Sequence, residues 1–143
     1  MSQGINPVAP HIHDMMNIGR AFLVWIVIIF VETVHGILRT LFLQPLVGDF
    51  RARQIGVFVG AALILAVAYA FSPWLHVQGR RLLIGIGLLW VALTIVFEAA
   101  LGRIALGLSW ERILSDYDFS HGGLMFFGLM FLGASPLIAA RLR

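Results

Sequence analysis

The sequence predicts an all-α integral membrane protein built as a bundle of four transmembrane helices. Hydrophobic residues make up 60% of the 143-residue chain and charged residues only 12%, whereas soluble domains carry roughly 25% charged residues. The mean hydropathy is +0.95. The apolar residues are gathered into four stretches, and each is close to or above the length that crosses a hydrocarbon core of about 30 Å.

The four predicted spans form one membrane domain over residues 1–143 and leave no room for a separate soluble domain. They cover residues 18–43, 55–72, 82–106 and 121–140. Spans one and two are expected to end at Gln44-Pro45 and Ser72-Pro73, because the residue before a proline avoids the helical conformation. Pro136 is expected to kink or end span four.

A short amphipathic helix is predicted before span four. Residues 109–114 place Trp110, Ile113 and Leu114 on one side of a helix, opposite Glu111 and Arg112. This pattern is typical of a helix that lies in the membrane interface.

The segment Gly56-Val-Phe-Val-Gly60 in span two is a GxxxG motif. Two glycines four residues apart allow a neighbouring helix to approach closely. The motif is common in apolar helices, so it predicts packing and does not by itself indicate a dimer.

The two halves of the chain resemble each other as two helical hairpins. Aligning Glu32 with Glu98 places Trp25 within one position of Trp90 and Gly36 opposite Gly102. Each half would then be a span with a late glutamate, an arginine, a short acidic loop and a return span. This pattern predicts a parallel internal repeat about an axis along the membrane normal, although two apolar hairpins can also resemble each other by chance.

Three ionisable residues interrupt the first apolar stretch and predict a site. Glu32, His35 and Arg39 follow the spacing i, i+3, i+7, which places them on one helix face. Ionisable groups at membrane depth are costly and often functional. Since four spans bring loops one and three to the same pole, Glu98 and Arg103 are expected to complete a ligand-binding or proton-relay site. The supporting residues expected at this pole are Arg51, Arg53, Asp116, Asp118 and His121.

Proton-linked transport or binding of a small solute is the function that this site favours. Carboxyl groups held at membrane depth beside arginines are candidates for reversible protonation. In its size, its four spans and the glutamate in its first helix, the chain resembles the small multidrug-resistance transporters. The second glutamate and the many arginines depart from that family, so none of its functional residues is transferred here. A homo-oligomer is expected, because four short spans have difficulty enclosing a solute path.

A purely structural ion-pair network is the first alternative. Buried charges are normally paired, and a paired network needs no ligand. The protein would then be an accessory or structural subunit of a larger membrane complex.

A metal or haem site is a second alternative, although no cofactor is predicted. Glu32-x-x-His35 has the spacing of a bundle di-iron ligand pair, which Glu98 and His121 could complete. A full di-iron set needs a second Glu-x-x-His pair, and Leu101 occupies that position. Haem held between His35 and His121 is also open.

A membrane enzyme acting on lipid is a third alternative, with the arginines binding a phosphate or carboxylate. No catalytic residue is predicted, because no nucleophile stands out, so the sequence leans away from an enzyme. The chain has no cysteine, which excludes disulfides and thiolate metal sites. The basic residues are sparse and adjacent to the membrane, which argues against nucleic-acid binding.

The charged residues also suggest how the chain is placed in the membrane. The ten Lys and Arg positions are all arginine, and they divide five and five between the two sides of the membrane. The five on the side of the termini and of the loop at Arg80 lie at span ends with few acidic partners. We therefore expect a bacterial inner-membrane protein with both termini in the cytoplasm.

Overall fold

The computed structural model describes residues 9–115, 117–118 and 124–143, and these residues form helices and connections without strands. Four helices are long and apolar enough to cross a membrane: Asp14–Val47, Asp49–Leu75, Arg80–Ala105 and Met125–Leu142. The prediction of four apolar helices is therefore confirmed. The arrangement is compatible with an integral membrane protein.

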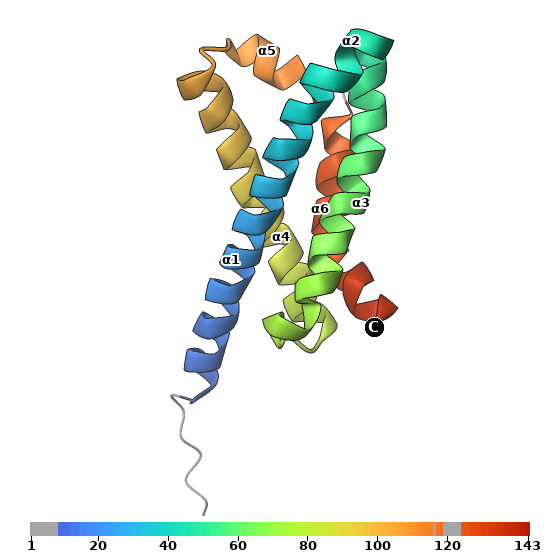
Figure 1. Cartoon of the computed structure of the whole chain (residues 1–143). Helices are drawn as coiled ribbons and strands as arrows, with labels where there is room; N and C mark the ends of the chain where they lie inside the picture. Colours follow the sequence, from blue (N-terminus) through green and yellow to red (C-terminus); the bar gives the residue numbers. More distant parts are fainter. Residues whose placement is uncertain (1–8, 116, 119–123) are drawn as a thin grey trace, which may run out of the picture.

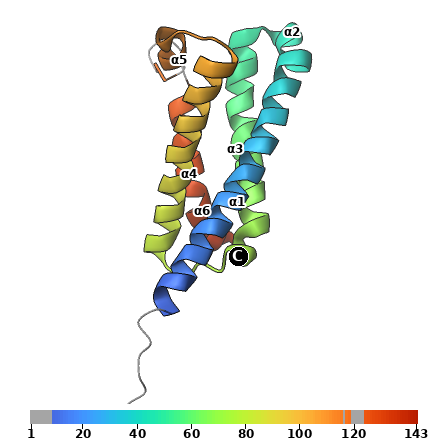
Figure 2. The same cartoon turned by 90° about the vertical axis from the view of Figure 1, so that its left-hand side faces the viewer.

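The helices run alternately up and down (Figure 1). In order they are α1 (Ala9–Leu38), the π-helical η1 (Arg39–Leu43), α2 (Gln44–Val47), α3 (Asp49–Leu75), α4 (Arg80–Ala100), the π-helical η2 (Leu101–Ala105), α5 (Trp110–Ser115) and α6 (Met125–Leu142). The start of α1, the α3–α4 connection and the C-terminus lie at one end, the terminal end (Figures 1 and 2). The other end, which holds α2 and α5, is called the loop end.

Two tryptophans join α1 to α4 where these helices cross. Trp25 Nε1 donates a hydrogen bond of 2.9 Å to Thr94 Oγ1, and Trp90 Nε1 donates one of 2.8 Å to the Ala21 carbonyl. A buried indole N–H needs an acceptor, so each bond satisfies a donor inside the core. The apolar core around them comprises Ala21, Val24, Trp25, Ile28, Ile64, Ala68, Leu75, Ile86, Trp90, Leu129, Leu132 and Ala139.

The prolines lie inside or between helical segments and do not end the spans at the predicted positions. Pro45 occupies the first turn of α2, so the span reaches Val47. The chain stays helical from η1 into α2, because Leu43 and Gln44 both have helical φ and ψ. Pro73 lies inside α3, which continues to Leu75. The residue before a proline is thus a weaker helix end here than the sequence predicted.

Pro136 also lies inside a helix, because α6 continues to Leu142. A proline leaves the carbonyl four residues earlier without its usual donor, and for Pro136 this is the carbonyl of Leu132. The Ser135 hydroxyl donates a hydrogen bond of 2.7 Å to that oxygen. A buried side chain therefore replaces the missing backbone bond.

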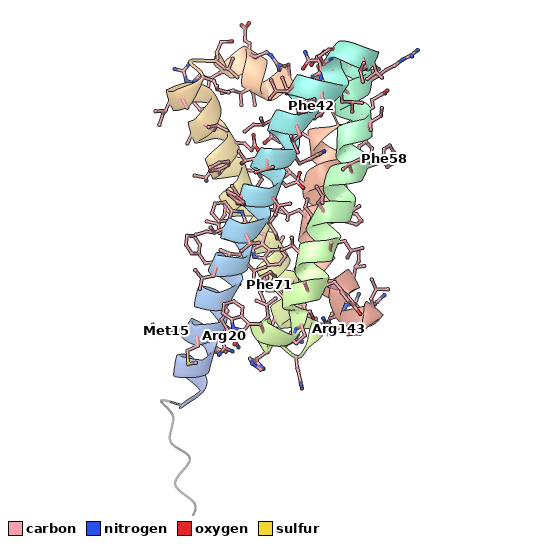
Figure 3. The ribbon with its side chains drawn as sticks, viewed as in Figure 1. Met15, Arg20, Phe42, Phe58, Phe71 and Arg143 are labelled. Atoms are coloured by element: carbon pink, nitrogen blue, oxygen red, sulfur yellow. The ribbon has the colours of Figure 1, made fainter. Side chains whose placement is uncertain are left out.

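The outer surface is strongly apolar. Phe58 on α3 and Phe42 on η1 are 77% and 66% exposed, and both lie on the outside of the bundle (Figure 3). Soluble monomers rarely expose contiguous apolar surface on this scale. Such a surface suits the hydrocarbon of a bilayer.

The predicted short helix before the last span is present as α5. The Arg112 N–H donates a hydrogen bond of 3.2 Å to Ser109 Oγ, which caps the start of this helix. Ile113 is buried, whereas Trp110 and Leu114 are exposed. The helix therefore has one side against the protein and apolar side chains on its outer surface.

Candidate ligand or proton-relay site

The predicted site begins as the continuation of the buried face of α1. Ala21, Trp25 and Ile28 are buried at helical spacing, and Glu32 and His35 follow them on the same face. The neighbouring helix α3 presents small buried residues at four-residue spacing, namely Ala52, Gly56 and Gly60. Polar side chains of α1 therefore meet α3 where that helix is narrowest.

Glu32 fits against Gly60. A Cβ atom at Gly60 would lie 2.8 Å from Glu32 Oε2, so any side chain there would displace the carboxyl group. His35 Nδ1 lies 3.5 Å from the same oxygen, and the side chains of Glu32 and His35 are 28% and 16% exposed. The other oxygen, Oε1, is inaccessible and has no hydrogen-bond partner among the described residues. One half of this carboxyl group is thus buried with its acceptor capacity unused.

Arg39 fits against Gly56 in the same way. It is the first residue of η1, and its Cδ would lie 2.8 Å from a Cβ atom at Gly56. Within the part of the chain that the structure describes, Arg39 forms no ion pair. Its guanidinium therefore contributes positive charge on the face of Glu32 without being neutralised by direct contact.

The other predicted half of the site lies on a different helix end. From their crossing at the tryptophans, α1 and α4 diverge towards the loop end in both views (Figures 1 and 2). Glu98 near the end of α4 is exposed and lines a cavity of about 220 Å³ with Gly102, Arg112 and Tyr117. The lining of this cavity does not include Glu32 or His35.

Arg103 is held by its own loop. Its Nη1 donates a hydrogen bond of 3.1 Å to the Leu108 carbonyl, and its guanidinium carbon lies 5.2 Å from the centre of the Trp110 ring. These contacts tie η2 to the connection before α5. Arg103 thus acts as a structural clamp at the loop end.

Of the described supporting residues, Arg51 and Arg53 lie on α3, and Asp118 lies after α5. Arg53 Nη2 lies 3.1 Å from Asp49 Oδ2 in the first turns of α3, and Arg51 is exposed. The Asp118 N–H donates a backbone hydrogen bond of 3.2 Å to the Ser115 carbonyl. Asp116 and His121 lie outside the described residues.

A metal site does not assemble from the residues that the structure describes, since these contain no group of three His, Asp or Glu side chains suited to one ion. Of the predicted ligands Glu32, His35, Glu98 and His121, Glu32 and His35 are in contact with each other. His121, which both the metal and the haem hypotheses use, is not described.

The sequence analysis missed that Gly56 and Gly60 belong to the site. The GxxxG motif gave the signal for close packing, and that packing is confirmed. What the motif could not indicate is that the glycines face a guanidinium stem and a carboxyl group.

No protein-family model matches the chain, and no curated protein or solved structure does so either. The site is therefore interpreted from its own geometry.

Proposed function

We propose that this chain is an integral membrane protein that binds a small solute in exchange for a proton, with Glu32 and His35 at the binding site. The solute would carry a positive charge or an N–H donor. Coupled to a change of access, this exchange is proton-linked transport. The observation that carries the proposal is Glu32 Oε1, which is buried and has no hydrogen-bond partner among the described residues.

If Glu32 is ionised, its Oε1 atom is buried without a hydrogen-bond donor among the described residues. Burying a charge without partners costs several kcal/mol. A proton on Glu32 removes that cost, and so does an N–H group of a solute that donates to Oε1. The two cannot occupy the same oxygen in full, so binding of one favours release of the other.

Arg39 and His35 support this exchange from the same face of α1. His35 Nδ1 lies 3.5 Å from Glu32 Oε2. Arg39 lies on the same face of α1 and forms no ion pair in the described structure. When a monovalent cation replaces the proton, the net charge of the site stays constant, which keeps both loaded states accessible.

Proton release from proteoliposomes tests the proposal directly. The purified protein would be reconstituted with a pH-sensitive dye inside the vesicles, and methylammonium and guanidinium would be added outside as probes. We expect a proton efflux larger than that of protein-free liposomes on addition of at least one probe, and the loss of this difference in Glu32→Gln. Asp49→Asn is the matched control, because Asp49 pairs with Arg53 outside the site. Equal efflux in wild type and Glu32→Gln, or no efflux with either probe in wild type, would contradict the proposal.

A structural role of the same residues is the second candidate, and the two glycines favour it. Gly56 and Gly60 leave room for Arg39 and Glu32, so the polar side chains can fix the register of α1 against α3. This role predicts that Glu32→Gln lowers thermal stability and leaves every solute-binding signal intact. The transport role predicts the reverse.

The proposed site belongs to a protein with a defined membrane, orientation and oligomeric state. We propose that the protein lies in a bacterial inner membrane, with both termini in the cytoplasm and α5 in the membrane interface. We also propose that it forms a homo-oligomer, in which each copy carries its own site. The two halves of the chain share a long helix that ends in a π-helical turn, η1 or η2. This shared feature supports an internal repeat. If the residues have the structural role, the expected partner is a larger membrane complex.

A further inference from the structure

A second site lies at the terminal end, on the opposite side of the helix crossing from Glu32. The hydrogen bond from Trp90 to the Ala21 carbonyl holds α1 and α4 together at the crossing, and towards the terminal end the two helices separate (Figure 1). A cleft of about 330 Å³ lies between them, and it is called the terminal cleft. Its lining includes Asp14, Asn17, Ala21, Arg81 and Gly85.

The terminal cleft has an apolar interior and a charged mouth. From Asp14 to Ala21 it extends about 10 Å along α1, and its walls include Ile18, Leu82 and Ile86. Asp14 and Arg81 are both exposed at the end of the helices. They carry opposite charges and form no ion pair with each other in the described structure.

This arrangement matches an amphiphile with one apolar chain and two opposite charges in its headgroup. We infer that the terminal cleft binds a phospholipid whose headgroup carries both a phosphate and a primary amine, as in phosphatidylethanolamine. The phosphate would bind to Arg81, since a guanidinium donates two parallel hydrogen bonds to phosphate oxygens. The ammonium would donate to Asp14, and part of one acyl chain would fill the cleft. The inference rests on the membrane placement proposed above and is independent of the exchange at Glu32.

The chemistry also determines which lipids are rejected. A choline headgroup has the positive charge but no N–H to donate to Asp14. A glycerol headgroup has the phosphate but no cation, so Asp14 would be left beside an anion. The cleft should therefore discriminate among headgroups that share the same acyl chains.

Native mass spectrometry of the purified full-length protein tests this site. Phosphatidylethanolamine, phosphatidylcholine and phosphatidylglycerol with identical acyl chains would be added in equal amounts to delipidated protein. We expect one bound phosphatidylethanolamine, retained about tenfold better than the other two, because only its ammonium can donate a hydrogen bond to the charged Asp14 carboxylate. Asp14→Asn should abolish the preference for the amine, and Arg81→Gln should weaken retention of all three lipids.

Two matched pairs of variants distinguish lipid binding in the terminal cleft from lipid binding elsewhere on the protein. A Cβ atom at Gly85 meets nothing within 4 Å, and Gly85 lines the cleft, so Gly85→Leu should fill the cleft without disturbing the fold and abolish retention. Gly19 is equally open but does not line the cleft, so Gly19→Leu should retain lipid. Arg80→Gln is the same control for Arg81→Gln, since Arg80 is exposed and outside the lining.

Several outcomes would overturn the inference. Equal retention of the three lipids by wild type would show that the cleft holds only unselected lipid or detergent. Unchanged retention in Gly85→Leu would place the lipid elsewhere on the protein. A Glu32→Gln variant should retain phosphatidylethanolamine like wild type, so failure of the exchange proposal leaves this measurement informative.

Discussion

Glu32 lies on a helix face whose preceding members are apolar, and the adjacent helix has a glycine where its carboxyl group needs space. The carboxyl oxygen Oε2 contacts His35, and Oε1 is buried without a partner in the described structure. Arg39 and Gly56 repeat the same pairing of a long side chain with a glycine two turns later. Each ionisable side chain of α1 therefore has a defined position against α3.

Gly60→Ala should disrupt solute binding more than it disrupts folding. The added Cβ would lie 2.8 Å from Glu32 Oε2, and the end of a flexible side chain can move away at little cost. The carboxyl group would then leave His35, and we expect binding of the probe cation to weaken about tenfold, measured by proton release. Gly36→Ala is the control, because a Cβ atom there meets nothing within 4 Å. A large loss of thermal stability with unchanged binding would contradict this assignment.

Thr94→Val should destabilise the helix crossing. Valine removes the acceptor of the Trp25 indole N–H at 2.9 Å and leaves that donor buried, which costs about 1–3 kcal/mol. The free energy of unfolding in mixed micelles measures the change. In a double-mutant cycle with Trp25→Phe, the two effects should be clearly less than additive. Additive effects would show that the two side chains do not share a bond.

At the scale of the helices, packing depends on where backbones meet and on how prolines are accommodated. A Cβ atom at Gly87 of α4 would lie within contact distance of the Gly133 carbonyl oxygen of α6, so these helices touch through their backbones. The Ser135 hydroxyl bonds to the Leu132 carbonyl, which lets α6 continue past Pro136. The first feature places α6 against α4, and the second keeps α6 helical.

Gly87→Ala should therefore lower stability much more than Gly85→Ala. At Gly87 the new atom meets the Gly133 backbone, which cannot move aside without separating α4 from α6. Overpacking of this kind costs about 1–3 kcal/mol. At Gly85 the new atom meets nothing within 4 Å, so we expect little change. Unfolding in a denaturing detergent compares the two variants, and equal stabilities would contradict the α4–α6 contact.

The sequence predicts the helices better than their ends and contacts. The four apolar stretches and the face shared by Glu32 and His35 follow from composition and helical spacing, and both are found. The structure continues the helices past Pro45 and Pro73. A π-helical turn leads into Pro45, and Arg143 donates hydrogen bonds of 3.1 and 2.9 Å to the Tyr69 carbonyl, which Pro73 leaves without its usual donor. The divergence of α1 and α4 towards the loop end (Figures 1 and 2) depends on crossing geometry that hydropathy does not encode.

At the scale of the whole molecule, the alternation of helices gives the protein two chemically different ends. The terminal end carries Arg20 and Arg143, whose guanidinium groups lie over Trp74 and Tyr69, and Figure 3 shows both arginines there. The loop end carries α2, α5 and the clamp formed by Arg103. The candidate exchange site lies between the crossing and the loop end, and the terminal cleft lies on the other side.

Labelling of single cysteines should report this arrangement in cells. The chain has no cysteine, so Gln78→Cys at the terminal end and Ser109→Cys at the loop end each provide one exposed thiol. With both termini in the cytoplasm, an impermeant maleimide should label Ser109→Cys in intact cells and Gln78→Cys only after permeabilisation. The opposite pattern would reverse the proposed orientation, and labelling of both in intact cells would contradict the four-span topology.

The central claim is that Glu32 takes up and releases a proton inside the bundle. Infrared difference spectroscopy of the reconstituted protein measures this directly, because a protonated carboxyl group has its own C=O stretching band. We predict a band that changes with pH and on addition of methylammonium or guanidinium, that is lost in Glu32→Gln and that persists in Asp49→Asn. A spectrum whose pH-dependent carboxyl bands are the same in wild type and Glu32→Gln would contradict the claim.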